Sequence, residues 1–381
     1  GKKECTALLK PEEGFEPSTL RGLSDPSATA GSFDGRASAF TLSRRHMKLK
    51  PTPPKDAVNR YLRDVEGHIT DKTHYNYATS LRRFLEWCDE NGITDMNDLD
   101  SELIDQFKEW RLQDVKPITA KNDMGTVRNF IEYAATIQAV PAGMSDLIRI
   151  PKVSEDDEIC DDYLTRQEAK AILEHLSTYE YASRRHITLL VLWKSGMRIS
   201  GLRSLDLGDF DEARPALEIR HRPETKTPLK RKSKSERDVI LSPDTADVIS
   251  DYIDSQRATT TDKFGRKPFL STREGRAART TIQKYVYTAT RPCYYNGNEC
   301  PYNRDTDTCE ALAFDQANKC PGSVSPHALR RGYVTAARNA GQPKEVTSER
   351  VNMSGPILDK HYDKGSHDEK AERRREHLKE I

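Results

Sequence analysis

The sequence predicts a mainly α-helical protein with a small β component, an α+β fold, built from two structured domains. Apolar residues recur at helical spacing across residues 54–150 and again from Thr165 onward. Only two short stretches, Leu217–Arg220 and Asp238–Leu241, have the composition of strands. An acidic, aperiodic segment at residues 151–162 separates the two helical regions, as an interdomain linker does.

The first domain is predicted to span residues 47–150 as a bundle of roughly four helices. The pair Asn91-Gly92, which is typical of turns, is expected to end one of them. Four apolar stripes, each one helix face wide, form the predicted core. They are Ala57, Tyr61, Leu62 and Val65; Tyr77, Leu81, Phe84, Leu85 and Cys88; Leu99, Leu103, Ile104, Phe107 and Trp110; and Val127, Phe130, Ile131 and Ala134.

Residues 1–46 are rich in Gly, Ser, Pro and charged residues and show no helical or strand period. We expect a disordered tail. Because position 1 is glycine and the first methionine is Met47, the alternative is that these residues are upstream reading frame outside the native protein.

The second domain is predicted to span residues 163–381. Thr165 can form a capping box with Glu168 at the start of its first helix. The longest apolar stretch, Ile187–Trp193, suits a buried helix. From Asp363 the chain alternates Lys, Arg and Glu, which suits either docking onto a second copy or a solvated helix face.

The composition excludes a membrane protein and leaves a nucleic-acid partner open. Charged residues make up 32% of the 381 residues, and mean hydropathy is −0.80. No apolar run approaches the ~20 residues of a membrane span, so we expect a soluble protein. The formal net charge is only +1, yet Arg220–Arg237 holds eight Lys or Arg against two Glu. A local patch of this kind can bind a polyanion whatever the total charge.

The seven cysteines, without a secretory signal peptide, indicate a reducing environment, so we expect a cytoplasmic protein. Four of them lie within 28 residues, inside a polar insertion at about residues 291–322. Four thiolates can hold a structural zinc ion, although no pair has the two-to-four-residue separation typical of zinc knuckles. Separate free thiols are the alternative. The four are Cys293, Cys300, Cys309 and Cys320.

Three short passages contain residues suited to phosphate chemistry. Arg198 follows a helix break at Gly196, where its planar fork can hold two phosphate oxygens; a surface arginine beside a helix cap is the alternative. His327 and Arg330 lie three residues apart behind a Ser-Pro helix start, and an exposed helical pair is the alternative. Tyr362 stands in a polar stretch, where core packing explains it poorly.

In this order, the passages resemble the tyrosine recombinase (phage integrase) family, especially its archaeal members. Gly196-Met-Arg198 with its following leucines is similar to the family's first arginine box, and His327-Ala-Leu-Arg330 to the second. Tyr362 falls about as far beyond the second box as the family's nucleophile does. The resemblance covers about residues 54–370 and implies an N-terminal SAM-like core-binding domain before a C-terminal catalytic domain.

The resemblance implies a site-specific recombinase that cuts and rejoins double-stranded DNA through a 3′-phosphotyrosine. The implied catalytic residues are Arg198, Lys232, His327, Arg330 and Tyr362. The family's hairpin lysine is matched to Lys232 by counting back from Glu236-Arg237, with Lys230 and Lys234 as alternatives. The chemistry needs no cofactor, and the family acts as a tetramer on DNA, whereas the free protein can be a monomer.

One departure from the family concerns the position nine residues before the nucleophile. The family usually has His or Trp there, and this chain has Met353, whose thioether cannot donate a hydrogen bond to phosphate. The methionine can still pack beside the site. Two rival functions remain: a type IB topoisomerase, which uses similar residues, and a DNA-binding regulator that has lost catalysis.

Overall fold

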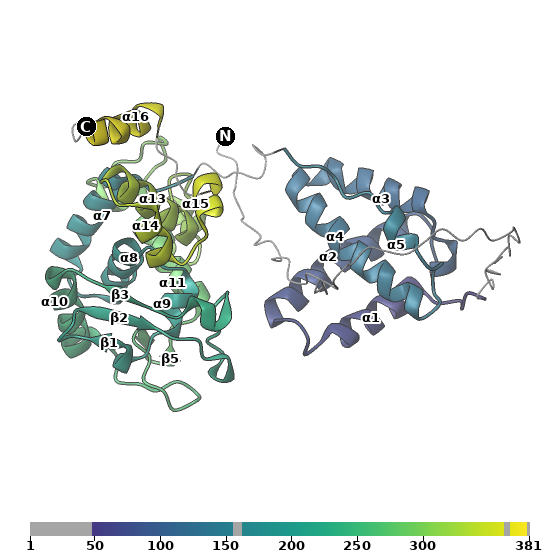
Figure 1. Cartoon of the computed structure of the whole chain (residues 1–381), viewed down its shortest axis with the longest axis horizontal. Helices are drawn as coiled ribbons and strands as arrows, with labels where there is room; N and C mark the ends of the chain where they lie inside the picture. Colours follow the sequence, from purple (N-terminus) through teal and green to yellow (C-terminus); the bar gives the residue numbers. More distant parts are fainter. Residues whose placement is uncertain (1–47, 155–161, 362–365, 379–381) are drawn as a thin grey trace, which may run out of the picture. The chain divides into compact units, whose positions relative to one another are not determined.

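The computed structural model describes residues 48–154, 162–361 and 366–378. The tail predicted at residues 1–46, most of the predicted linker and Tyr362 lie outside the described residues. The described residues up to 154 belong to one compact unit and those from 162 to a second. Both units are drawn in Figure 1.

The first unit is the helical bundle that the apolar stripes predict, with a short helix, α5, and a 3-10 turn, η1, in addition. Its core joins all four stripes, with the rings of Phe84, Phe107 and Phe130 in edge contact. The second helix ends at Glu90, and Asn91-Gly92 forms the turn, with Gly92 at φ +68°. The elements are α1 (Pro54–Val65), α2 (Asp71–Glu90), η1 (Met96–Asp98), α3 (Ser101–Asp114), α4 (Pro117–Thr136) and α5 (Met144–Leu147).

The second unit is mainly helical with two small sheets, which confirms the predicted fold class. Its elements up to the second sheet are α7 (Arg166–Tyr179), α8 (Arg184–Ser195), α9 (Ile199–Ser204), η2 (Leu207–Asp209), β1 (Phe210–Asp211), β2 (Ala216–Ile219), η3 (Pro223–Thr225), η4 (Lys232–Ser235), β3 (Arg237–Ile240), α10 (Pro243–Asp251), the π-helical turn η5 (Tyr252–Gln256), β4 (Ser271–Thr272) and β5 (Gly275–Arg276). The remaining elements are α11 (Arg279–Ala289), α12 (Pro292–Tyr295), η6 (Glu310–Leu312), η7 (Ala317–Lys319), α13 (Pro326–Asn339), α14 (Lys344–Val351), α15 (Gly355–His361) and α16 (His367–Leu378).

The larger sheet has the antiparallel order β1-β2-β3, with Leu217 opposite Val239. Both predicted strands are present, each beginning one residue earlier than expected. The sequence pattern missed β1, β4 and β5, because a two-residue strand has no measurable alternation. Within the described residues, no helix is long and apolar enough to cross a membrane.

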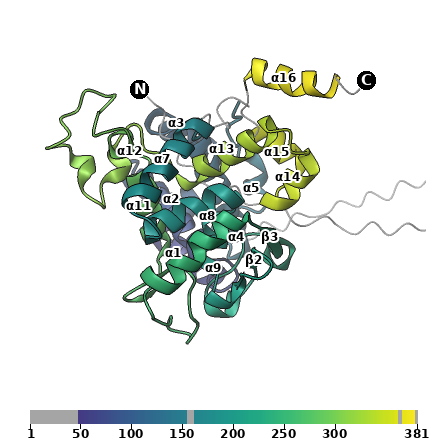
Figure 2. The same ribbon diagram turned by 90° about the vertical axis from the view of Figure 1, so that its left-hand side faces the viewer.

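Helix α8 lies at the centre of the second unit and packs against α7, α11 and α13 (Figure 2). Its apolar residues are buried around most of its circumference, from Ile187 to Leu192, which confirms the predicted buried helix. The capping box of Thr165 with Glu168 starts α7 as expected. These helices supply the rigid frame on which the candidate site is built.

A close backbone contact joins α13 to the chain that precedes α7. The amide of Leu164 donates to the carbonyl of Ala328 at 3.3 Å. A Cβ atom at Gly332 would overlap the carbonyl oxygen of Leu164 and come within 3.0 Å of the Trp193 ring. Glycine is therefore required at position 332 by space, and not by its backbone angles.

Replacing this glycine should destabilise the second unit. Gly332→Ala forces the added methyl against main-chain atoms, and overpacking of this kind costs about 1–3 kcal/mol. Urea unfolding followed by circular dichroism measures the change. The matched control is Gly208→Ala, because a Cβ at Gly208 meets no atom within 4 Å. Equal midpoints for the two variants would contradict the proposed steric role.

Candidate functional site

Arg198 is held by helix ends on both sides. Helix α8 closes with Gly196 in the left-handed conformation at φ +61°, and Arg198 is the N-cap residue of α9. A Cβ at Gly196 would overlap the Tyr333 ring and lie 2.9 Å from Val351 Cγ1, so α13 and α14 press directly on this turn. The partly buried Arg198 donates from Nη1 to the carbonyl of Asn352 at 3.3 Å.

His327 and Arg330 lie in the first turns of α13, which begins as predicted with Ser325 as its cap and Pro326 in its first turn. Arg330 is only 1% exposed, so an exposed helical pair is the wrong interpretation. Its Nη1 donates to the carbonyl of Gly196 at 2.7 Å. This hydrogen bond joins the two arginine boxes, which are more than a hundred residues apart in sequence.

The imidazole of His327 stays uncharged in the folded protein. Burial lowers the pKa of His327 to about 3, and the positive charges of Arg330, Arg331, Arg198 and Arg279 add to the shift. Arg198 and Arg330 are thus both close enough to His327 to act on it electrostatically. The structure therefore brings three of the five predicted catalytic residues together.

The predicted lysine lies between β2 and β3, in a connection that contains two short 3-10 turns. Lys232 starts the second turn with φ +52°, and its side chain is exposed. Lys230 and Lys234 are exposed as well, so exposure does not separate the three candidates. Lys232 remains the choice made from the sequence.

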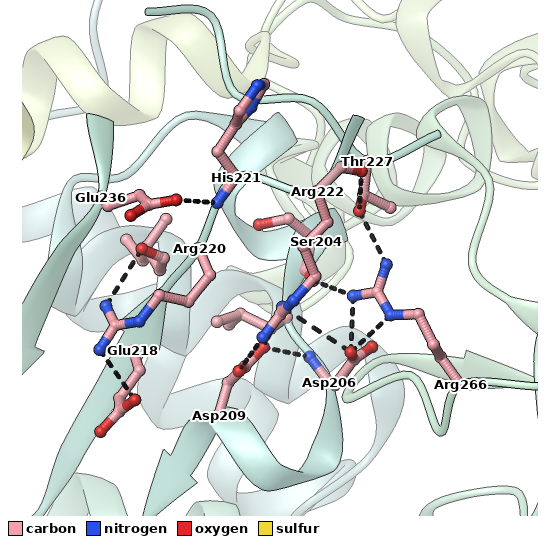
Figure 3. A network of polar contacts seen from close by, with 12 residues as sticks. Ser204, Asp206, Asp209, Glu218, Arg220, His221, Arg222, Thr227, Glu236 and Arg266 are labelled. Carbon is pink, nitrogen blue, oxygen red and sulfur yellow. Dashed lines mark hydrogen bonds and ion pairs between the residues drawn. The ribbon is translucent and has the colours of Figure 1, made fainter. Parts of the chain in front are cut away.

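A polar network anchors the base of this connection (Figure 3). Arg222 holds the buried Asp209 with bonds of 2.6 and 2.7 Å. Arg266 donates to Asp206 at 2.6 Å and to Thr227 at 2.9 Å. Asp206 and Asp209 follow α9 in the sequence, and Arg198 is the N-cap of the same helix. The network therefore fixes the connection between β2 and β3 to the segment that carries Arg198.

Two residues of the site were not predicted from the sequence. Arg237 donates from Nε to the carbonyl of Arg350 at 2.8 Å, and burial, together with the charges of Arg198 and Arg350, lowers the pKa of Arg237 to about 10. Asn352 accepts from Arg198 and contacts the lysine hairpin. In the sequence, Arg237 was used only as a reference point for counting back to Lys232, and Asn352 resembles an ordinary turn residue. Neither therefore gave a signal of a role in the site.

Met353, which replaces the family's usual His or Trp, is 6% exposed. It belongs to a small apolar cluster with Val334, Val351 and Leu358. Its side chain therefore packs α15 against α13 and α14, in agreement with the packing role expected from the sequence. The predicted nucleophile, Tyr362, follows α15 in the sequence but lies outside the described residues.

The four cysteines of the insertion have free thiols, and Cys320 is buried. Burial raises the pKa of the Cys293 thiol; Arg291 opposes this rise, and Cys320, Cys300 and Cys309 add to it. Across the described ranges, no group of three or more His, Cys, Asp or Glu side chains is positioned to hold a metal ion. The cysteines are therefore neighbours, but not in a coordination geometry.

Arg198 and Arg330 lie near an uncharged histidine, and Arg237 lies near Arg198, so the site is suited to an anion. Guanidinium groups bind phosphate oxygens through paired donors, and a neutral imidazole can accept a proton or donate one from its other nitrogen. The arrangement can therefore bind a phosphodiester and assist proton transfer beside it.

Comparison with known proteins agrees with this geometry. The model of the phage integrase family matches residues 162–352, and the model of the phage integrase N-terminal SAM-like domain matches residues 58–137. Comparison with curated proteins gives no significant match.

Three solved structures illustrate the shared fold. The Tn1549 transposon integrase in complex with transposon right end DNA is 14% identical, with a TM-score of 0.57 over 85% of this chain and 99% of that one. A lambda integrase dimer bound to a COC′ core site is 12% identical, with a TM-score of 0.57 over 84% and 79%. A lambda integrase tetramer bound to a Holliday junction is 12% identical, with a TM-score of 0.56 over 84% and 80%.

The catalytic-domain match, the SAM-like match and the joined arginine boxes lead to one conclusion: this chain belongs to the phage integrase family of tyrosine recombinases.

Proposed function

We propose that the protein is a catalytically active, site-specific DNA recombinase that cuts and rejoins double-stranded DNA through a 3′-phosphotyrosine at Tyr362. The main support is the buried hydrogen bond from Arg330 to Gly196, because it assembles both arginine boxes and His327 into one preformed anion site. Preorganised donors of this kind stabilise the charge that develops on a phosphate during cleavage.

In this proposal each side chain has one role. Arg198 and Arg330 hold the two non-bridging oxygens of the scissile phosphate. Tyr362 attacks phosphorus, and the bond to the 5′ oxygen breaks as that oxygen takes a proton from Lys232. His327, uncharged in the free protein, accepts the proton of the tyrosine. The reverse attack by a 5′-hydroxyl rejoins the strand, so protein side chains suffice and no metal ion takes part.

We further propose that the protein acts on DNA in the cytoplasm as a tetramer. The lambda integrase structures include a dimer on a core site and a tetramer on a Holliday junction, and the Tn1549 integrase is bound to transposon DNA. The mostly exposed, charged helix α16 is available for contact with a second copy.

Tyr362→Phe should abolish covalent capture of DNA, because it removes the attacking oxygen and leaves the ring in place. The probe is a pool of random-sequence duplexes with a nick in one strand, so that the short cleaved piece diffuses away and rejoining stops. Wild type and the control Tyr179→Phe, an exposed tyrosine, should give adducts that survive denaturation. Capture by Tyr362→Phe at the wild-type level, or none by wild type, would overturn the proposal.

The captured sequences also separate the two rival functions. A recombinase enriches one short sequence among its adducts, whereas a type IB topoisomerase captures many sequences and relaxes supercoiled plasmids that lack the enriched site. A regulator without catalysis binds the pool but forms no adduct.

The uncharged state of His327 should make the DNA-free protein sensitive to acid. The pKa is about 3 in the folded protein and 6.5 ordinarily, so the unfolded chain binds the proton first and stability falls as pH drops from 6.5 toward 3. Between pH 7.5 and 5.0 this residue should account for up to about 2 kcal/mol of lost unfolding free energy. Urea unfolding of His327→Gln should show a smaller loss than wild type, whereas the exposed-site control His68→Gln should not.

We also propose that the four cysteines of the insertion bind a structural zinc ion. Their segments lie side by side: a Cβ at Gly322 would lie 2.5 Å from Pro292 and 2.8 Å from Tyr302. Lys319 bonds Glu310 at 2.7 Å, which brings the segment of Cys309 to that of Cys320. Four thiolates brought together by a zinc ion would bind it at Zn–S distances near ~2.3 Å.

Elemental analysis of the purified protein should find about one zinc ion per chain, the number that one four-thiolate site holds. Cys309→Ser should lose the metal, whereas the control Cys88→Ala, in the first unit, should keep it. A strong chelator should lower the unfolding temperature of wild type but not of Cys309→Ser. Metal-free wild type, or zinc retained by Cys309→Ser, would refute the site.

A further inference from the structure

Asn352, in the turn between α14 and α15, contacts both Arg198 and the connection that carries Lys232. It is the C-cap of α14 and has a left-handed backbone at φ +49°. Its carbonyl accepts from Arg198 at 3.3 Å. Its side-chain amide donates from Nδ2 to the carbonyl of Lys234 at 3.2 Å, and its Oδ1 accepts a longer bond from Arg231 Nη1 at 3.5 Å.

These side-chain contacts lie on both sides of Lys232. Arg231 precedes the lysine and Lys234 follows it by two residues. The side-chain amide of Asn352 therefore contacts the turn on both sides of Lys232. The amide has a donor and an acceptor, and the two contacts use one of each. A carboxylate could satisfy only the arginine, and an apolar side chain could satisfy neither.

The turn around Lys232 needs such support. Lys232 has φ +52°, a conformation that side chains other than Gly, Asn and Asp adopt rarely. Within the turn, the Arg231 amide bonds Ser235 Oγ at 3.2 Å and the Lys232 amide bonds the Leu229 carbonyl at 3.1 Å. Two sets of hydrogen bonds connect this turn and the strand after it to the end of α14. One is made by the Asn352 side chain, and the other is the bond from Arg237 to the carbonyl of Arg350.

We propose that Asn352 is a positioning residue that holds the hairpin turn so that Lys232 can protonate the 5′ oxygen of the leaving strand. The inference rests on the proposed function. It predicts that the Asn352 side chain matters for protonation of the leaving oxygen and not for attack on phosphorus.

The test compares two leaving groups on the duplex that wild type captures. One version has the normal 5′ oxygen, and the other has sulfur in its place, which departs as a thiolate and needs no proton. Asn352→Gly removes the amide but keeps the left-handed backbone and the carbonyl that Arg198 uses. It should cleave the oxygen substrate at least ~10-fold more slowly than wild type and the sulfur substrate at nearly the wild-type rate, because a general acid contributes roughly 10²–10⁴-fold.

Lys232→Ala is the reference variant. Its cleavage rate should fall further than that of Asn352→Gly on the oxygen substrate and should return to nearly the wild-type rate on the sulfur substrate. Asn352→Asp, which keeps the acceptor but not the donor, should also be slow on oxygen and rescued by sulfur. The matched control is Asn303→Gly, another left-handed asparagine, at φ +52° in the cysteine insertion. It should match wild type on both substrates.

Each remaining result overturns a distinct claim. Equal slowing of Asn352→Gly on both substrates, or no slowing on either, overturns the positioning role. Sulfur rescue of Lys230→Ala or Lys234→Ala, but not of Lys232→Ala, overturns the choice of lysine and with it this role. If wild type captures no duplex from the random pool, the proposed function itself is refuted.

Discussion

The guanidinium of Arg330 is buried and donates to the carbonyl of Gly196, the residue that closes α8. A charged group in the interior requires a satisfied geometry, because an unpaired buried charge costs several kcal/mol. The need for an acceptor fixes α13 against the end of α8. Gly196 supplies this acceptor because its left-handed conformation turns its carbonyl toward Arg330. The position of Arg198, two residues later, then follows from the same turn.

Arginines of the site share one kind of partner. Arg330 and Arg350 donate to carbonyls at the end of α8, at Gly196 and Lys194, and Arg237 and Arg198 donate to carbonyls at the end of α14. The last carbonyls of a helix lack partners within the helix and bear its partial negative charge. The C-terminal ends of α8 and α14 therefore hold several positively charged arginines close together in the absence of DNA. Burial is the main reason that the pKa values of His327 and Arg237 are lowered, and repulsion from the neighbouring arginines adds to both shifts.

The sequence was sufficient to predict the parts of the fold that depend on local periodicity. The four stripes of the first unit, the buried helix α8 and the caps at Thr165 and Ser325 follow from spacing and side-chain chemistry. The two-residue strands were beyond such reasoning, since they exist only through pairing with distant residues.

The candidate site was predictable only in part. The ordered boxes identified Arg198, His327 and Arg330 through a family resemblance, because each box alone is an ordinary sequence. Arg237 and Asn352 act through contacts with residues more than one hundred positions away, and no local pattern encodes such a partnership. The choice among Lys230, Lys232 and Lys234 also depends on how a turn is held, which spacing alone does not determine.

Main-chain acceptors have a consequence for how such a site tolerates substitutions. A carbonyl oxygen is present whatever side chain occupies the position, so substitutions at Lys194 or Arg350 leave the acceptors for the arginines in place. The arginines at these two helix ends therefore depend on the path of the backbone and not on the identity of those side chains. An exchange of the side chain at either position would therefore change the local surface and leave the oxygen that holds the neighbouring arginine where it is.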